Sequence, residues 1–326
     1  MRTDPSRHGI LQPISGCGEA QVGMDVAEGC AATCIHCTGG LAGDKYGQPT
    51  APVVEREAGA KVSRELEALA GVGRRPARIR LGVVSDPFLP DPKVLAATCE
   101  VLAAAFDGGV PVEIHTRSMV PEAVLGLLKT HPHMVHVVMG VMGMRDSAAR
   151  VYEPSLPPPL GRLKGLRPLM AAGIPVTVRV EPLIPLVNDT EADLEELFSA
   201  VAKVGVKRVE LAYLQLTPDT AKSLSRGLPR MHREMLKGLF GQEPWRESPQ
   251  GTRKLLPRML RDAGYERALE SARRVGLYAS VCATVDPDVK GARVCHRALG
   301  DAPVVPAARK STPPVAATQQ LGLFKG

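Results

Sequence analysis

Aromatic residues are scarce in this sequence: they make up 3% of its 326 residues, and Trp245 is the only tryptophan. Proteins that bind single-stranded nucleic acid along a broad surface stack the bases on many aromatic rings, so a surface of that kind is excluded. Long apolar runs are also missing, and none reaches the length of a membrane-spanning helix. Residues 1–12 are polar and lack the apolar centre of a secretory signal. We therefore expect a cytoplasmic protein with no membrane partner.

The rest of the composition is typical of a globular protein, with 44% hydrophobic and 23% charged residues. A chain of this length can bury a substantial core, either as one large α/β domain or as one domain with appendages. Lysine and arginine outnumber aspartate and glutamate and give a formal net charge of +7. This excess favours an anionic partner, although many enzymes that act on small molecules are equally basic.

From about residue 21 the sequence alternates short β-branched or apolar runs with longer segments of helical periodicity. The pattern predicts strands at 21–26, 78–84, 110–116, 134–139, 175–184 and 207–214, and helices at 53–69, 92–106, 121–129, 160–172 and 190–204. Successive β-α units indicate a parallel sheet covered by helices. Six units are fewer than the eight of a closed barrel, so we expect an α/β fold, a partial (β/α)6 TIM-type barrel.

The pattern changes after residue 217, where two basic helical segments are followed by a strand-like run at 276–282. From residue 301 the sequence is rich in proline and alanine, a composition typical of disordered segments. We therefore divide the chain into an N-terminal extension (1–20), the barrel (21–217), a mainly helical C-terminal extension (218–300) and a flexible tail (301–326).

Seven cysteines are present, and three of them, Cys30, Cys34 and Cys37, fall within eight residues. Clustered thiols in a reducing compartment indicate metal binding or catalysis rather than disulfides. Three thiolates at this spacing, on a loop after the first predicted strand, can ligate three irons of a cubane cluster. The fourth iron then keeps an open position for a substrate or cofactor. The alternatives are three unrelated thiols or a structural zinc site, for which the adjacent His36 is badly placed as a fourth ligand.

The C-x3-C-x2-C spacing, placed after the first strand of a β-α series, resembles the signature of the radical S-adenosylmethionine (SAM) superfamily. The resemblance covers roughly residues 22–216 and implies a [4Fe–4S] cluster on the three cysteines, with SAM at the open iron. It implies that an electron from the cluster cleaves SAM to methionine and a 5′-deoxyadenosyl radical, which abstracts hydrogen from a substrate. An electron donor such as flavodoxin or ferredoxin is then needed. His36 stands where the family usually has an aromatic residue that stacks on the adenine.

Phrases at the predicted strand ends resemble the branch of this superfamily that contains spore photoproduct lyase and the DNA repair photolyase homologues. They are Ser85-Asp86-Pro-Phe-Leu-Pro, Thr-Arg117-Ser, Glu153-Pro, and Arg179-x-Glu-Pro followed by Pro-x-x-Asn-Asp. The resemblance implies that Ser85 and Asp86 contact the methionine part of SAM. Arg117, where the family usually has lysine, would grip the carboxylate of SAM bidentately.

Three further positions follow from the same resemblance. Glu153 and Arg179 are candidates for ribose or substrate contacts, and Gly140 stands where relatives often have serine. Other interpretations are open: Ser85 and Asp86 could cap the following helix, Arg117 could be a surface charge, and Arg179 could form a structural ion pair with Glu181.

One departure from the branch concerns the chemistry. Spore photoproduct lyase uses a cysteine just before the Ser-Asp pair as a hydrogen donor, and this chain has Val84 there. A direct copy of thymine-dimer reversal is therefore not expected.

Two features of the remaining sequence concern clusters and partners. Cys17, Cys282 and Cys295 could hold an auxiliary cluster, although they show no tight spacing. The segment from Gln320 to Phe324 resembles the short motif by which bacterial DNA repair and replication proteins bind the sliding clamp. The same segment could instead pack on its own domain.

Three functions remain open at this stage. The first is a radical SAM enzyme that acts on a DNA base or lesion. The second is a radical SAM enzyme that modifies a peptide or small metabolite. The third is a non-catalytic, metal-stabilised nucleic-acid-binding protein. Formation of 5′-deoxyadenosine separates the third from the others, and salt-dependent binding to duplex DNA separates the first from the second.

Overall fold

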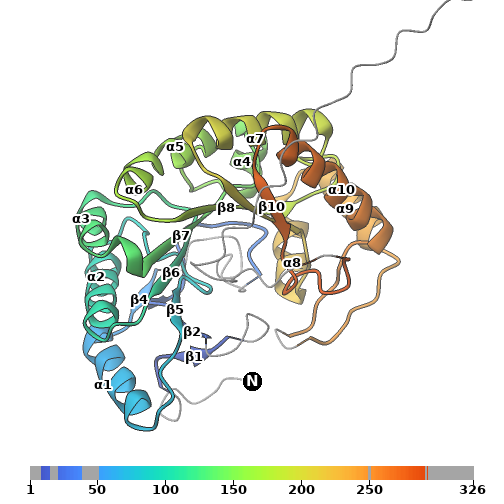
Figure 1. Ribbon diagram of the computed structural model, residues 1–326. Coiled ribbons are helices and arrows are strands. Elements are labelled where there is room, and N and C mark those ends of the chain that lie inside the picture. The colour runs from blue at the N-terminus through green and yellow to red at the C-terminus, as the bar shows by residue number, and fades with distance from the viewer. Residues whose placement is uncertain (1–8, 15–20, 39–50, 249–250, 291, 293–326) are drawn as a thin grey trace, which may run out of the picture.

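The computed structural model of the protein describes residues 9–14, 21–38, 51–248, 251–290 and 292. They form a curved eight-stranded sheet with helices packed around its outer side (Figure 1). The strand order is β1 (Gln12–Pro13), β2 (Gln21–Met24), β5 (Arg78–Leu81), β6 (Val112–Thr116), β7 (Val135–Gly140), β8 (Val176–Leu183), β9 (Arg208–Tyr213) and β10 (Tyr278–Val281). β1 is antiparallel to β2, and every other neighbouring pair is parallel.

The partial TIM-type barrel predicted from the sequence is confirmed, and each of the six predicted strands is present in it. The sheet also contains a seventh parallel strand, β10, which lies in the segment that the sequence pattern assigned to the C-terminal extension. Its residues pair in parallel with β9, from Tyr278 opposite Arg208 to Val281 opposite Leu211. The sheet of the barrel therefore continues beyond residue 217.

Helices connect the parallel strands on the outer side of the sheet. Those of the barrel are α1 (Ala58–Gly71), α2 (Pro92–Asp107), α3 (Glu122–Thr130), α4 (Asp146–Tyr152), α5 (Pro159–Lys164), α6 (Arg167–Ala171) and α7 (Glu191–Val204). Three more lie between β9 and β10: α8 (Pro218–Gly227), α9 (Arg230–Phe240) and α10 (Arg258–Arg274). The remaining elements are a short antiparallel pair, β3 (Ala27–Glu28) and β4 (Val53–Val54), and a 3-10 turn, Pro132–Met134.

Local sequence signals explain where several helices begin and end. The Asp91 carboxylate accepts a hydrogen bond from the Lys93 N–H at 2.8 Å and so caps α2, which begins with proline. Thr190 caps α7 in the same way. Gly205 follows α7 with a φ of 101°, a left-handed conformation that favours glycine.

Two helix predictions differ from the structure. The segment predicted as one helix at 160–172 forms α5 and α6, because Pro168 lacks an N–H and is accommodated only near the start of a new helix. The segment predicted at 53–69 becomes helical only at Ala58, and its first two residues form β4 instead. The sequence pattern did not predict α4.

The two faces of the barrel sheet differ in polarity. In β5, the buried Ile79 and Leu81 alternate with Arg78 and Arg80, which contact Glu113 of β6. Apolar strand residues therefore pack on one face under the helices, and the opposite face carries charged side chains. Among the described residues, no helix combines the length and the apolar character that crossing a bilayer requires.

Candidate metal centre

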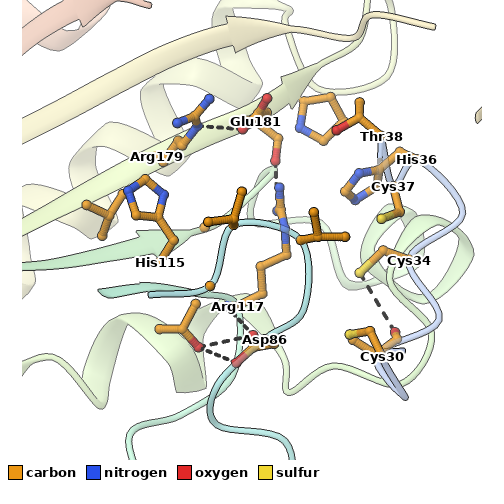
Figure 2. Close-up of a pocket in the computed structure, with 18 of the residues that line it drawn as sticks. Cys30, Cys34, His36, Cys37, Thr38, Asp86, His115, Arg117, Arg179 and Glu181 are labelled. Atoms are coloured by element: carbon orange, nitrogen blue, oxygen red, sulfur yellow. Dashed lines mark hydrogen bonds and ion pairs between the residues drawn. The ribbon is translucent and has the colours of Figure 1, made fainter. Parts of the chain in front are cut away.

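The loop that follows β2 carries the cysteines predicted to bind metal, at the carboxyl edge of the parallel strands. Figure 2 shows all three, Cys30, Cys34 and Cys37, along this loop on one side of a cavity. Hydrogen bonds from other elements hold the loop in place. The Ile35 N–H donates to the carbonyl oxygen of Tyr152 at 3.0 Å, and the Thr220 hydroxyl donates to the carbonyl oxygen of Cys37 at 2.7 Å.

The chemistry of the three thiols fits an iron–sulfur cluster. Cys30 and Cys34 are buried, and burial raises the pKa of both thiols because a thiolate is poorly solvated there. A cationic metal offsets this cost by taking the place of the proton. All three thiols also line the same cavity, on one side of it. An all-sulfur donor set on one loop is typical of iron–sulfur ligation.

Glu153, directly after α4, is the centre of a buried ion-pair network behind this loop. Its carboxylate accepts from Arg162 Nη2 at 2.5 Å, from Arg117 Nη1 at 2.8 Å and from His36 Nε2 at 3.3 Å. Burial alone would raise the pKa of Glu153, but the two guanidiniums outweigh it and hold that pKa well below its ordinary value. Burial lowers the pKa of His36, so a neutral imidazole donates its Nε2 proton to an ionised Glu153.

A different metal site is geometrically available nearby. Cys34, His36 and Glu153 each place a potential ligand atom within 4.8 Å of the others. Both oxygens of Glu153 already accept hydrogen bonds from guanidinium groups, and those cations would repel a metal ion. The arrangement therefore favours Glu153 as the residue that orients His36 and Arg117, and the thiols as the metal ligands.

Ser85 and Asp86 follow β5 and connect three segments of the site. The Ser85 hydroxyl donates to the carbonyl oxygen of Gly29 on the cysteine loop at 2.8 Å. The Asp86 carboxylate accepts from the Arg117 N–H at 2.7 Å and from the Thr116 hydroxyl at 2.9 Å. These residues do not cap α2, whose cap is Asp91. Ser85 instead contacts the cysteine loop, and Asp86 fixes the backbone at Arg117 and Ser118.

Gly140, the last residue of β7, provides the space that the Arg117 side chain occupies. A Cβ added at Gly140 would lie 2.9 Å from Cγ of Arg117, closer than two unbonded carbon atoms approach. Arg117 is thus not a surface charge: it is partly buried, and its Nη1 also donates to the carbonyl oxygen of Glu181 at 2.8 Å.

The cavity beside the cysteine loop has a volume of about 310 Å³. Its lining comes from the carboxyl ends of several strands and from two later segments, and the sequence-predicted residues that line it are Cys30, Cys34, His36, Cys37, Ser85, Asp86, Arg117, Gly140 and Arg179. Glu153 lies behind this lining. Figure 2 shows Arg117 between the cysteines on one side and His115 and Arg179 on the other.

Two further residues that line the cavity, Arg80 and His115, were not singled out by the sequence analysis, and both contact the buried Glu113 of β6. Glu113 accepts from His115 Nε2 at 2.7 Å and lies 3.3 Å from Arg80 Nη2. Arg179 Nε donates to Glu181 at 2.5 Å, so the ion pair considered from the sequence is present, and Arg179 also lines the cavity. The period-two alternation of charged with apolar residues, in β5 and again at Arg179 and Glu181 of β8, is a sequence signal that could have revealed this polar interior.

Other residues of the C-terminal segment contribute to the cavity as well. Arg253 lines it. Its neighbour Lys254 pairs with Leu216, close after β9, through two backbone hydrogen bonds of 2.8 and 2.9 Å, and this pairing holds the segment at the cavity. Cys282 is buried near Ala212 and Val285. Its suggested cluster partners Cys17 and Cys295 lie outside the described residues, as does the segment from Gln320 to Phe324.

Comparisons with curated proteins find relatives of undefined activity. No family model matches the sequence. An uncharacterized protein of Acidianus two-tailed virus is 30% identical over 134 residues, which cover 40% of this chain and 44% of the viral protein. An uncharacterized protein of Mycobacterium tuberculosis is 24% identical over 221 residues, which cover 64% of this chain and 63% of the relative. The chain thus spans less than two thirds of the length of either relative.

Comparisons with solved structures identify the fold. A cysteine-to-serine mutant of spore photoproduct lyase superposes with a TM-score of 0.66 at 15% identity, covering 85% of this chain and 80% of the lyase. Another mutant of that lyase, with bound AdoMet and dinucleoside spore photoproduct, gives a TM-score of 0.64 at 14% identity, covering 82% of this chain and 78% of the lyase. The chain therefore has the fold of spore photoproduct lyase, and its resemblance to the radical SAM superfamily is confirmed at the level of the fold.

Proposed function

We propose that this chain is a radical SAM enzyme that binds a [4Fe–4S] cluster through Cys30, Cys34 and Cys37 and binds SAM in the adjacent cavity. The observation that carries the proposal is the cysteine loop itself. It places three thiols beside a cavity that Arg117 and Asp86 line, at the carboxyl edge of a partial barrel. Active sites of parallel α/β barrels lie at this edge.

The residues around the cavity fit the parts of SAM. Arg117 would bind the carboxylate, with its guanidinium positioned by Glu153 and its backbone by Asp86. Ser85 would support the methionine part, and Gly140 leaves room for the arginine. His36 offers a planar ring for the adenine, and Arg179 is a candidate for ribose or substrate contacts. When bound, the cluster supplies the electron that converts SAM to methionine and a 5′-deoxyadenosyl radical.

For the substrate, we favour a DNA base or lesion. The similar lyase binds a dinucleoside spore photoproduct, and this chain carries a net positive charge of +7.

The segment from Gln320 to Phe324 would recruit the enzyme to the DNA sliding clamp. Calorimetry with a peptide of residues 312–326 and with its Leu321→Ala/Phe324→Ala form can test this. A reducing compartment, the cytoplasm, suits a cluster on three thiols that form no disulfide.

A second candidate function is the modification of a peptide or small metabolite. Val84 favours it, because this residue lines the cavity and stands where the branch that the sequence resembles has a hydrogen-donating cysteine, and a valine side chain offers no weak S–H bond. The two candidates share the cluster and SAM and differ only in substrate.

The test of the proposed function is anaerobic reconstitution with iron and sulfide. The wild type should become brown, show the electron paramagnetic resonance signal of a reduced [4Fe–4S] cluster with dithionite, and release 5′-deoxyadenosine from SAM. The Cys30→Ala/Cys34→Ala/Cys37→Ala variant should do none of these, whereas Cys99→Ala, a half-buried thiol of α2, should behave like the wild type. A colourless protein with zinc at the three thiols would refute the proposal.

A second experiment concerns the substrate. Transfer of deuterium from DNA with labelled thymine into 5′-deoxyadenosine distinguishes DNA from other substrates.

A further inference from the structure

Gln215 carries a buried side-chain amide at the carboxyl edge of the sheet, just after the end of β9. The residue lines the cavity beside the cysteine loop. It is only 4% exposed, and within the described part of the chain its Oε1 has neither a hydrogen-bond partner nor contact with solvent. An amide oxygen buried without a partner destabilises a protein, and such groups are rare in folded chains. The amide is therefore a candidate for binding a ligand in the cavity.

The backbone holds Gln215 in place from both sides. The N–H of Leu214 donates to the carbonyl oxygen of Leu183, the last residue of β8, at 2.8 Å. Leu216 exchanges two backbone hydrogen bonds with Lys254, of 2.8 and 2.9 Å. The side chain of Gln215 can still turn about its last bonds, which have broad torsional preferences, and so bring the amide oxygen to the cavity. Gln215 is thus a fixed position that offers an amide to a ligand.

The chemistry of an amide indicates which kind of ligand it fits. A glutamine side chain places a donor, Nε2, next to an acceptor, Oε1. The Watson–Crick edge of a nucleobase also places a donor next to an acceptor, as N3–H and O4 do in thymine, so both hydrogen bonds can form at once. The N–H and C=O of a trans peptide group point in opposite directions, and one glutamine amide cannot bind both. The amide of Gln215 therefore fits a nucleobase better than a peptide backbone.

The adenine of SAM has such an edge too, and Arg253 distinguishes the two possible ligands. Leu216 and Lys254 form an antiparallel bridge, and successive residues of paired segments face opposite sides, so Gln215 and Arg253 share the other side of this bridge. Both residues line the cavity. A guanidinium suits the phosphate of a nucleotide, whereas SAM has no phosphate and its sulfonium is itself a cation. The two side chains together favour a nucleotide of the substrate over SAM.

We propose that Gln215 determines the specificity for the substrate by pairing its amide with the Watson–Crick edge of a base extruded into the cavity. This inference rests on the proposed function, and within it on the choice of DNA as substrate. With thymine, Oε1 accepts a hydrogen bond from N3–H, and Nε2 donates to the adjacent carbonyl oxygen. The pairing supplies the partner that the buried amide oxygen lacks in the protein alone.

The first test is a binding cycle between this residue and the base. The reconstituted protein, with SAM and without a reductant, is titrated by calorimetry with the dinucleotide thymidylyl-thymidine and with its N3-methylated form, which lacks the donor. The wild type should bind the methylated form about tenfold more weakly. Gln215→Leu, which keeps the size of the side chain, should bind the unmodified dinucleotide about tenfold more weakly than the wild type, and methylation should weaken it by less than about twofold further. Gln242→Leu, at an exposed position after α9, should match the wild type with both probes.

The second test separates recognition of the base from folding and from the binding of SAM. Because the wild-type amide is buried without a partner for its oxygen, Gln215→Leu should unfold at the same or a higher urea concentration than the wild type, both in the metal-free form. A residue that held the fold together would show the opposite shift. The affinity of the reconstituted variant for SAM, measured by calorimetry, should stay within about twofold of the wild type, because the amide binds the other ligand.

Three outcomes overturn the assignment of Gln215 while leaving the radical SAM chemistry intact. The first is a wild type that does not bind the dinucleotide or binds both of its forms equally well. The second is a cycle in which the effects of Gln215→Leu and of methylation simply add. The third is a variant that loses affinity for SAM alone, which would assign the amide to the adenine of SAM. Absence of 5′-deoxyadenosine from the wild type with dithionite is the separate result that removes the proposed function.

Discussion

At the scale of single residues, Arg117 and Gly140 form an interdependent pair at the edge of the cavity. The branch that the sequence resembles usually has a lysine and often a serine at these two positions. This chain has arginine, which is longer than lysine, at position 117 and glycine, which has no side chain, at position 140. A Cβ at Gly140 would lie 2.9 Å from Cγ of Arg117. The two differences from the branch therefore compensate for each other in volume.

The pair can be tested through the affinity for SAM. Gly140→Ser should displace the Arg117 side chain and weaken SAM binding to the reconstituted protein by about tenfold, since overpacking of a tight contact costs about 1–3 kcal/mol. Arg117→Lys/Gly140→Ser should recover most of the loss, because the shorter lysine leaves room for serine. Isothermal titration calorimetry measures both effects. Gly126→Ser in α3, where an added Cβ meets nothing within 4 Å, is the control. Unchanged affinity in Gly140→Ser would show that the guanidinium does not bind SAM.

Glu210 of β9 gives a prediction about pH and stability. Burial raises its pKa to about 8, against the opposing effect of Arg179. Between pH 5 and 8 the folded protein therefore keeps a proton on Glu210 that the unfolded chain releases. Because the folded state binds more protons in this window, the free energy of unfolding falls as the pH rises.

Glu210→Gln removes this dependence while keeping the shape of the side chain. The variant should gain stability relative to the wild type as the pH rises from 5 to 8, by up to about 1.4 kcal/mol per pH unit. Urea unfolding of the metal-free protein at several pH values measures the difference. Glu266→Gln, on the exposed side of α10, should follow the wild type throughout. A constant difference between Glu210→Gln and the wild type across this range would contradict a raised pKa.

At the scale of secondary-structure elements, α8 stabilises the cysteine loop through one hydroxyl. Thr220→Val keeps the shape of the side chain but leaves the Cys37 carbonyl without this donor, which costs about 1–3 kcal/mol locally. We expect the reconstituted cluster to bleach several-fold faster in air, measured as loss of visible absorbance. Ser225→Ala on the same helix removes a hydroxyl that donates to the carbonyl of Lys222 on the exposed side, and should bleach at the wild-type rate. Equal bleaching of Thr220→Val and the wild type would show that α8 does not support the loop.

The sequence predicts the elements with regular patterns and misses those that depend on tertiary contacts. The six strands are readable because β-branched runs alternate with capped helices, as at Asp91 and Thr190. The membership of β10 in the sheet is not readable from its own residues, because it depends on pairing with β9. The three cysteines are evident from their spacing, whereas the contribution of Arg253 to the cavity depends on the pairing of Leu216 with Lys254, a contact between distant segments.

At the scale of the whole molecule, the choice between DNA and a small substrate is a question of how many phosphates the protein contacts. Each neutralised phosphate adds about −0.9 to the slope of log affinity against log salt concentration for duplex DNA. A neutral metabolite or peptide gives a slope near zero. The formal charge of +7 permits several phosphate contacts, and Arg253 is a cation that lines the cavity.

We therefore expect the affinity for a duplex with a single thymine lesion to fall by at least about tenfold between 50 and 200 mM salt, as for two or more phosphate contacts. Arg253→Gln should weaken binding several-fold and reduce the slope by about one, whereas Lys207→Gln at the amino edge of the sheet should change neither. Fluorescence anisotropy with labelled oligonucleotides measures both quantities. A salt-independent affinity, or an Arg253→Gln variant with the wild-type slope, would argue against DNA in this cavity. The substrate would then be sought among peptides and metabolites, while the assignments of the cluster and SAM would remain.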